Sequence, residues 1–382
     1  MATRTRPKPS AVDKAVSRAK RIALFNHKGG VSKTTTTFNL GWMLASKGHR
    51  VVMVDADPQC NLSGLVLGYK GQNEFESFYE NQPQRNIRAG LSPAFESRPK
   101  EIEAIECVPV EGNTNLFLLP GHIRLSEYEV SLGMAQELSG TIQTLQNLPG
   151  SLSYLLEKTG QRYRAEFILI DLNPSLSSIN QNLVMTSDFF IVPASPDYFS
   201  VMAIDSLTTV FPRWRAWARQ ASSMSVFRDA TYPLPTTIPK FLGTIIQKYR
   251  IRVQAGHDEE ELGAPSSGTP AMGFQKWIDE INSTVRKKFV PMLRREEMML
   301  DDQKYRQQGI EKDYCLASVS EFNSLIAKSQ EHQVPVYQLT DQQIGLTGVV
   351  LERTLKSKNM FEAIFNKLGE MVVELTSDAV GT

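Results

Sequence analysis

Residues 26–35 read NHKGGVSKTT, directly after the apolar run 22–25 (IALF). A short apolar run of this kind is typical of a buried parallel strand, and a helical pattern of apolar residues follows the threonines. Gly29 and Gly30 let the backbone approach an anion closely. The N-terminus of the following helix adds partial positive charge. The segment therefore predicts a phosphate-binding loop between a strand and a helix.

The elements around this loop predict a mostly parallel, doubly wound sheet. The helix after the loop ends at Lys47-Gly48, and a second apolar run, 51–54, leads into Asp55. Strand, loop, helix and strand make one βαβ unit. Further strands are expected at 116–119, 167–170, 189–193 and 242–246, and helices at 126–157, interrupted at Pro149-Gly150, and at 200–219. Such alternation predicts an α/β fold with helices on both faces of the sheet.

A length of 382 residues accommodates one large domain with insertions. We expect a basic, flexible tail at 1–20, a single domain at 21–376 and a short tail at 377–382. Two polar stretches predict insertions, at 69–115, with mixed loops and a short strand near 105–110, and at 250–310, with a mobile acidic loop at 255–272. The helix 358–376 has one apolar face, which we expect to pack on the domain.

The composition of the chain limits the classes of protein to which it can belong. The formal net charge is +1, so any nucleic-acid surface must be local rather than a property of the whole chain. The three cysteines, Cys60, Cys107 and Cys315, match no zinc or disulfide spacing. The sequence contains no apolar run of about 18 residues and no signal-peptide pattern. These observations predict a cytoplasmic protein without a membrane partner.

The loop supplies residue types that phosphate binding needs. Lys33 can reach the β- and γ-phosphates of a nucleotide, and the Thr34 hydroxyl can bind Mg²⁺. The common motif G-x-x-x-x-G-K-[ST] is absent, because His27 and Ser32 occupy its glycine positions. If position 32 requires a positive φ, serine costs about 1 kcal/mol there, whereas a helical φ would let its hydroxyl contact phosphate. The predicted phosphate site comprises Lys28, Gly29, Gly30, Val31, Ser32, Lys33, Thr34 and Thr35.

The loop resembles the deviant Walker A motif of the ParA/MinD family, K-G-G-V-G-K-T-T. Residues 54–63 (VDADPQCNLS) and 167–176 (FILIDLNPSL) resemble the family's next two motifs, with Asn173 in place of a proline. The resemblance implies a P-loop NTPase fold, Mg²⁺-dependent slow ATP hydrolysis and an ATP-dependent homodimer. It implies catalytic roles for Lys28, Lys33 and Asp57, and Mg²⁺ binding by Thr34, Asp57 and Asp171.

Lys28 stands at the family's signature lysine, which reaches across a dimer interface to the partner's nucleotide. The tight bend at Gly29-Gly30 predicts that the Lys28 side chain leaves its own phosphate site. Opposite a second copy it could then reach the partner's γ-phosphate, in a two-fold symmetric interface.

The family hosts several functions, so four hypotheses arise. The first is partition of DNA or positioning of cargo, with nucleoid association through non-specific DNA binding and a partner protein that stimulates hydrolysis. Its basic cluster would comprise Arg286, Lys287, Lys288, Arg294 and Arg295, with Lys248, Arg250 and Arg252 nearby. The alternative is a nucleotide-sensing regulatory ATPase that controls a partner without a partition role.

Two other functions fit less well. A membrane cycle through helix 358–376 is disfavoured, because its polar face carries Glu362, Glu370 and Glu374. An iron–sulfur carrier is disfavoured, because no cysteine lies near Asp171 in the sequence.

Overall fold

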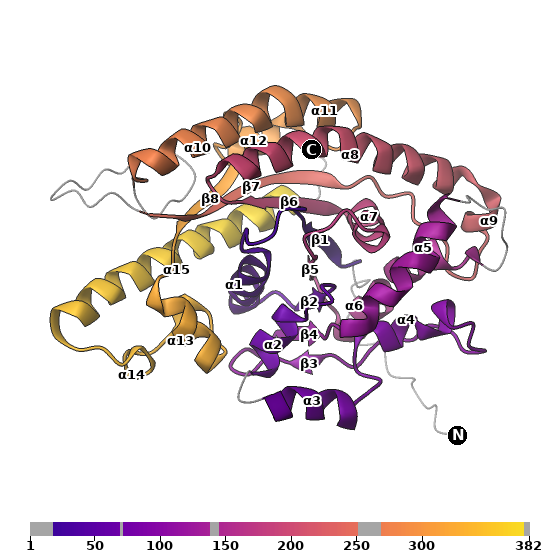
Figure 1. Cartoon of the computed structure of the whole chain (residues 1–382), viewed down its shortest axis with the longest axis horizontal. Coiled ribbons are helices and arrows are strands. Elements are labelled where there is room, and N and C mark those ends of the chain that lie inside the picture. The colour runs from indigo at the N-terminus through magenta and orange to yellow at the C-terminus, as the bar shows by residue number, and fades with distance from the viewer. Residues whose placement is uncertain (1–17, 69–71, 138–144, 251–268, 378–382) are drawn as a thin grey trace, which may run out of the picture.

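An eight-stranded sheet forms the centre of the molecule (Figure 1). The computed structural model describes residues 18–68, 72–137, 145–250 and 269–377. The predicted tails, the acidic loop and Arg252 therefore lie wholly or mostly outside the described residues. The strands are β1 (Lys20–Leu24), β2 (Val51–Asp55), β3 (Val108–Pro109), β4 (Leu116–Leu119), β5 (Phe167–Asp171), β6 (Phe189–Ala194), β7 (Lys240–Tyr249) and β8 (Cys315–Ser320).

The strand order is β3-β4-β2-β5-β1-β6-β7-β8, and every pairing except β3–β4 is parallel. β1 lies at the point where the chain order reverses, with β5 and β6 as its neighbours. Ligands of open parallel sheets bind at the carboxyl ends of the strands at such a point. Leu24, Asp55 and Asp171 share one register there. The fold thus brings the loop after β1 and two strand-end carboxylates to the same edge.

Helices cover both faces of the sheet, as expected. α1 and α15 pack together over one face, and α6, α7 and α8 cover the other (Figure 1). The helices are α1 (Lys33–Ser46), α2 (Asn61–Leu67), α3 (Gln72–Asn81), α4 (Ile87–Phe95), α5 (Glu127–Glu137), α6 (Leu148–Tyr163), α7 (Ser178–Met185), α8 (Tyr198–Ser223), α9 (Ser225–Arg228), α10 (Met272–Thr284), α11 (Val290–Arg295), α12 (Asp302–Gln307), α13 (Ser324–His332), α14 (Asp341–Ile344) and α15 (Gly348–Thr376), with the short turns η1 (Ile123–Ser126), η3 (Val285–Phe289, a π-helix) and η4 (Val336–Gln338).

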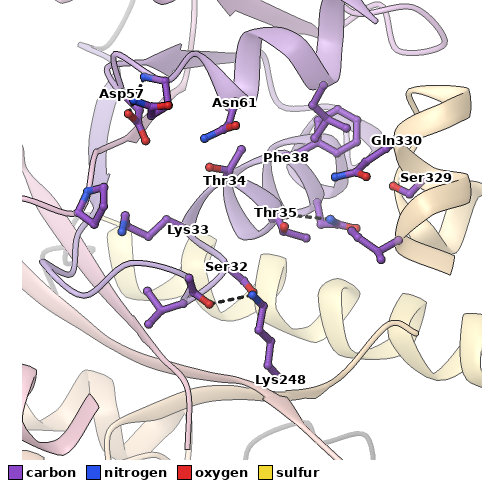
Figure 2. Close-up of a pocket in the computed structure, with 17 residues that line it drawn as sticks. Ser32, Lys33, Thr34, Thr35, Phe38, Asp57, Asn61, Lys248, Ser329 and Gln330 are labelled. Carbon is purple, nitrogen blue, oxygen red and sulfur yellow. Dashed lines mark hydrogen bonds between the residues drawn. The ribbon is translucent and has the colours of Figure 1, made fainter. Parts of the chain in front are cut away.

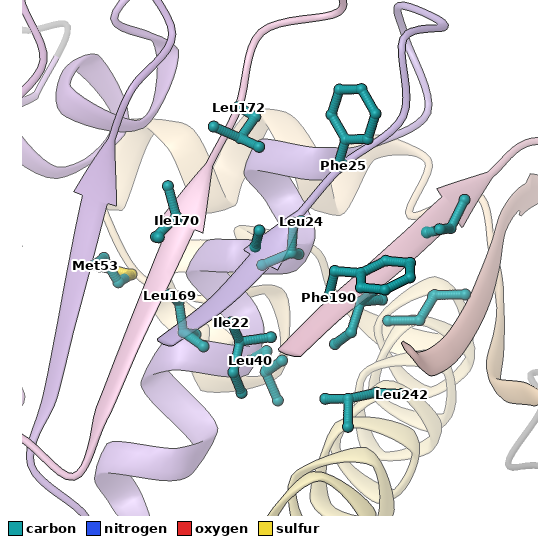
Figure 3. Packing of buried hydrophobic residues seen from close by; sticks show 14 of the residues in the cluster. Ile22, Leu24, Phe25, Leu40, Met53, Leu169, Ile170, Leu172, Phe190 and Leu242 are labelled. Carbon is teal, nitrogen blue, oxygen red and sulfur yellow. The ribbon is translucent and has the colours of Figure 1, made fainter. Parts of the chain in front are cut away.

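The apolar runs of the sequence form the core. Ile22 and Leu24 of β1 lie beside Leu169 of β5, with Leu40 of α1 close by (Figure 3). α1 approaches β2 closely at Gly41, where a Cβ atom would lie 2.8 Å from the sulfur of Met53. This close packing fixes the start of α1, and with it the phosphate loop, against the sheet.

Two expectations about the helical regions were wrong. The helix predicted over 126–157 is interrupted before Pro149-Gly150 rather than at it, because α6 begins at Leu148 and Pro149 occupies its first turn. Proline is favoured in the first turn of a helix, where its missing N–H has no intrahelical role. The stretch 69–115 contains helices α3 and α4 rather than mixed loops.

The sequence signal for α4 is local. Asn86 caps it by accepting a hydrogen bond from the Ala89 N–H at 2.9 Å. Ile87 and Leu91, four residues apart, are both buried. The stretch 250–310 is also largely helical, with α10, α11 and α12 following residue 269. The expected strand near 105–110 is reduced to β3.

The C-terminal apolar face packs on the domain, as expected from the sequence. Phe361, Phe365 and Leu368 of α15 are buried, and the helix contacts α1 and β8. None of the helices that the structure describes combines the length and apolar character needed to cross a bilayer.

Candidate functional site

The loop after β1 adopts two left-handed backbone conformations. Gly30 has φ 74°, and Ser32 has φ 60° and ψ 32°. The Ser32 carbonyl accepts the Thr36 N–H at 2.9 Å and thereby opens α1. Of the two conformations left open for Ser32, the structure has the strained one, which costs about 1 kcal/mol for a residue with a Cβ. Successive backbone N–H groups in left-handed loop conformations can form a concave site for an anion.

Lys33 is buried inside this loop. Its Nζ donates to the carbonyl oxygen of Asn26 at 3.0 Å and to that of Lys28 at 3.3 Å. The Asn26 amide donates in turn to the Pro193 carbonyl at 2.8 Å, which fixes the loop to β6. Burial lowers the pKa of Lys33, and the carboxylates of Asp171 and Asp57 oppose this shift. A lysine held between loop carbonyls and two carboxylates is positioned for an anionic ligand that arrives with a cation.

Asp55 and Asp171 lie opposite each other at the ends of β2 and β5. Asp55 accepts bonds from both the N–H and the hydroxyl of Ser63, each at 2.7 Å, so it anchors α2 to the sheet. Burial raises the pKa of Asp55 to about 6, and the Ser63 hydrogen bonds oppose that rise.

Asp171 is fully buried, and neither of its carboxylate oxygens has a hydrogen-bond partner among the described residues. Burial raises its pKa well above the usual range, and the charge of Asp55 adds to the shift. The Thr34 hydroxyl and the Lys33 ammonium favour the charged form. Buried carboxylate oxygens without partners are costly, so this site fits a cation.

Two cavities adjoin the loop. The first, of about 340 Å³, is lined by the loop, by Asp57 and by Lys248 (Figure 2). The second, of about 480 Å³, lies between the end of β7 and α13. The two share the lining residues Ser32, Thr35, Lys248, Ile326 and Gln330. They therefore form one continuous depression that begins at the phosphate loop.

Comparison with known proteins assigns the family. A family model described as an AAA domain matches residues 19–221, more than half of the chain. The chain belongs to the ParA/MinD family. The chromosome partitioning protein ParA of Caulobacter vibrioides is 30% identical over 200 residues, which cover 51% of this chain and 62% of that protein. The sporulation initiation inhibitor protein Soj of Bacillus subtilis is 32% identical over 189 residues, which cover 49% of this chain and 63% of that protein. The chain thus spans under two thirds of the length of these relatives.

Solved structures extend the likeness of fold over nearly the whole chain. The ATP complex of a McdA variant from Cyanothece has a TM-score of 0.55 at 15% identity, and the match covers 96% of this chain and 100% of that one. An apo McdA structure has a TM-score of 0.54 at 16% identity, covering 93% and 99%. At such identity the likeness concerns the fold, and it confirms the expected α/β P-loop architecture.

Most of the predicted ParA/MinD site residues lie together. Of the predicted residues, those that line the first cavity are Gly30, Val31, Ser32, Lys33, Thr34, Thr35 and Asp57. Asp57 accepts a hydrogen bond from the Gln59 N–H at 2.9 Å, and burial raises its pKa. Asp171 lies beneath the cavity, next to Lys33 and Thr34. Gly29 and Lys28 are outside its lining.

Lys28 leaves its own phosphate site and contacts α8 of the same chain. Its Nζ donates to the carboxylate of Asp197 and, at 3.1 Å, to the Ser200 hydroxyl. Asp197 is also the N-cap of α8, accepting the Ser200 N–H at 2.9 Å. Lys28 is therefore held within its own chain by the first turn of α8.

The predicted basic cluster is partly neutralised by acidic neighbours. Lys288 contacts Asp205 at 2.7 Å, and Arg294 contacts Asp302 through two bonds of 2.6 and 3.1 Å. Lys248 lines both cavities and contacts the phosphate loop. From the sequence it was grouped with the basic residues, and the residues that would contact a base were left open.

Proposed function

We propose that the chain binds Mg-ATP in this depression, hydrolyses it slowly and uses it to form a homodimer that acts in DNA partition or cargo positioning. One observation carries the proposal: the buried Lys33 ammonium is held by loop carbonyls beside the carboxylates of Asp57 and Asp171. Such a charge arrangement suits a polyphosphate accompanied by a divalent cation.

The triphosphate would lie over the loop. The left-handed conformations of Gly30 and Ser32 form the concave run of N–H groups that binds phosphate, and the N-terminus of α1 points into it. Lys33 would give its remaining donor capacity to phosphate oxygens, because an ammonium group has three N–H bonds.

The residues around Asp171 fit Mg²⁺. Its two unpartnered oxygens, the Thr34 hydroxyl and Asp57 provide the oxygen ligands that this ion prefers, directly or through water. When bound there, Mg²⁺ would neutralise charge on the β- and γ-phosphates. Asp57 would orient the attacking water. Burial raises the pKa of its carboxyl in the protein without a ligand.

The base would occupy the second cavity. Phe322 and Ile326 provide apolar surface for a flat ring, and the amides of Gln247, Asn323 and Gln330 line the same space. An apolar cleft with a few convergent polar groups is the usual form of a small-molecule site.

A second copy would dock on the face that holds Lys28. Next to Asp197, the first two turns of α8 expose 52% of Tyr198, 70% of Phe199 and 48% of Met202. Leu176, shortly after Asp171, is 46% exposed. Large apolar side chains gathered on one surface are typical of an interaction site. A partner bound here would place its own Lys28 near the nucleotide.

Hydrolysis in this arrangement is expected to be slow, because a second chain must supply a lysine. A partner protein would accelerate the reaction. The name of the relative from Caulobacter vibrioides, the chromosome partitioning protein ParA, supports partition among the functions open to this family. Exposed Arg286, Lys287 and Arg295 would bind DNA phosphates without sequence preference.

Calorimetric titration with Mg-ATP tests the proposal. Lys33→Ala should lose measurable binding, whereas Lys47→Ala, which changes the C-cap at the far end of the same helix, should retain wild-type affinity. Equal affinity in wild type and Lys33→Ala would refute the phosphate site. ATP binding without DNA binding, at any salt concentration, would favour a nucleotide-sensing regulator instead.

A further inference from the structure

Lys248 has an unusual backbone conformation near the end of β7. Its φ of 64° is left-handed, and the pairing of β7 with β8 shifts register between Gln247 and Tyr249. Those two neighbours are buried, whereas Lys248 is exposed. A left-handed conformation is strained for a lysine, and such irregularities of strands often re-aim a side chain at a functional site.

The irregularity aims Lys248 at the phosphate loop. Its Nζ donates to the carbonyl oxygen of Gly30 at 2.8 Å. Figure 2 shows the side chain reaching the loop beside Ser32, away from Asp57. Lys248 lines both cavities, so it stands where the phosphate end of the depression meets the end assigned to the base.

We propose that Lys248 is a nucleotide-binding residue that contacts the phosphates nearest the ribose from within the same chain. This inference rests on the proposed function, because it assumes that ATP occupies the two cavities. An ammonium has three N–H donors, and the contact with Gly30 uses one of them. The others are available to phosphate oxygens, with the Gly30 contact holding the side chain in place.

The distribution of charge around the depression supports a role for Lys248 in phosphate binding. Lys33 lies near Asp57 and Asp171, so the positive charge there is balanced before a nucleotide binds. The ammonium of Lys28 contacts Asp197 instead. Glu321 also lines the second cavity, but its carboxylate contacts Arg250 at 3.3 Å. The Lys248 ammonium can therefore bind the phosphates without a contribution from a partner chain.

In this arrangement Lys248 and Lys28 would have different roles. Lys248 would strengthen binding of ATP and ADP equally in the monomer, since both nucleotides have the phosphates nearest the ribose. Lys28 would act on ATP in the dimer. Product ADP would then stay bound after the dimer separates.

The test compares Lys248→Met, Lys248→Arg and the wild type by calorimetry with Mg-ATP and Mg-ADP. Lys312→Met, which removes an exposed lysine outside both cavities, is the matched control. Lys248→Met should weaken both nucleotides by about tenfold, the usual effect of losing a charge-assisted hydrogen bond at a partly exposed site. Lys248→Arg should recover most of the affinity, and Lys312→Met should match the wild type.

Salt dependence distinguishes a phosphate contact from a mere support of the loop. If Lys248 pairs with phosphate, the difference between wild type and Lys248→Met should shrink as salt rises from about 0.05 to 0.5 M. A difference that stays constant with salt, or unchanged affinity in Lys248→Met, would overturn the inference while leaving the proposed function intact. A wild-type chain that binds neither nucleotide would overturn both.

Discussion

The ammonium of Lys28 contacts the carboxylate of Asp197 within one chain, although Lys28 is the residue that a ParA-type dimer would direct to its partner's nucleotide. The Lys28 Nζ also donates to the Ser200 hydroxyl, at 3.1 Å. In the proposed switch the pair must separate before Lys28 can cross an interface. The contact would then oppose dimerisation until ATP is bound. The conformation of the exposed first turn of α8 would depend on whether the Lys28–Asp197 contact is intact.

Asp197→Asn should make the ATP-bound dimer tighter by several-fold. The substitution removes the charge that holds Lys28, while asparagine keeps the side-chain oxygen that caps α8. Both residues are partly exposed, so the ion pair contributes at most about 1 kcal/mol per chain. The dimer dissociation constant with ATP, measured by analytical ultracentrifugation, checks this.

Asp205→Asn is the matched control, because Asp205 also lies on α8 and pairs with a lysine, Lys288, at 2.7 Å. It should leave the dimer unchanged. A weaker dimer in Asp197→Asn would show that Asp197 holds Lys28 in its working position rather than away from it.

Ser32→Gly should stabilise the apo protein by about 0.5–1 kcal/mol, since glycine adopts the left-handed conformation without strain. Urea denaturation monitored by circular dichroism measures the change. Ser222→Gly, in the right-handed helix α8, should instead destabilise by about 0.5 kcal/mol. Loss of stability in both variants would mean that the Ser32 conformation carries no strain.

Asp57→Ala should bind ATP and lose turnover. If Asp57 orients the attacking water, phosphate release should fall by at least about 100-fold, the scale of a general-base contribution. Calorimetry on the same preparation should still detect ATP binding, because Lys33 and the loop remain. Phosphate release at the wild-type rate would exclude this role for Asp57.

The exposed basic residues should differ in how much each contributes to DNA binding. Replacing Arg286, Lys287 and Arg295 by alanine together should weaken ATP-dependent DNA binding and lower the salt slope by about 0.9 for each DNA phosphate that the protein no longer neutralises. Replacing Lys288 and Arg294 should have a smaller effect, because Asp205 and Asp302 already neutralise them. Equal slopes in the wild type and both variants would exclude this surface as the DNA site.

The sequence alone predicts the phosphate loop and the strand-end carboxylates, because those features are local. The apolar run 22–25, the glycine pair and the lysine follow one another within a short segment. Parallel strands then bring Asp55 and Asp171 together at one edge whatever the intervening loops do. The conformation of Ser32 stays open at the level of sequence, since a serine at that position is compatible with either sign of φ.

Two features that the sequence did not predict depend on long-range packing. The charge pattern groups Lys248 with other basic residues, because it carries no information about the irregularity that turns this side chain toward Gly30. The contact between Lys28 and Asp197 joins residues 169 positions apart. Helix α4 was missed because its polar surroundings outweigh the local signals of Asn86, Ile87 and Leu91.

Light scattering of the Asp57→Ala protein measures whether ATP drives formation of a dimer that uses Lys28 in trans. Blocking hydrolysis at Asp57 keeps the nucleotide in the state under study. We expect a dimer with Mg-ATP, a monomer with Mg-ADP, and a monomer with Mg-ATP once Lys28→Ala is added, although calorimetry should still detect ATP binding to that double variant. A mass that is the same with ATP and ADP, and unaffected by Lys28→Ala, would contradict it.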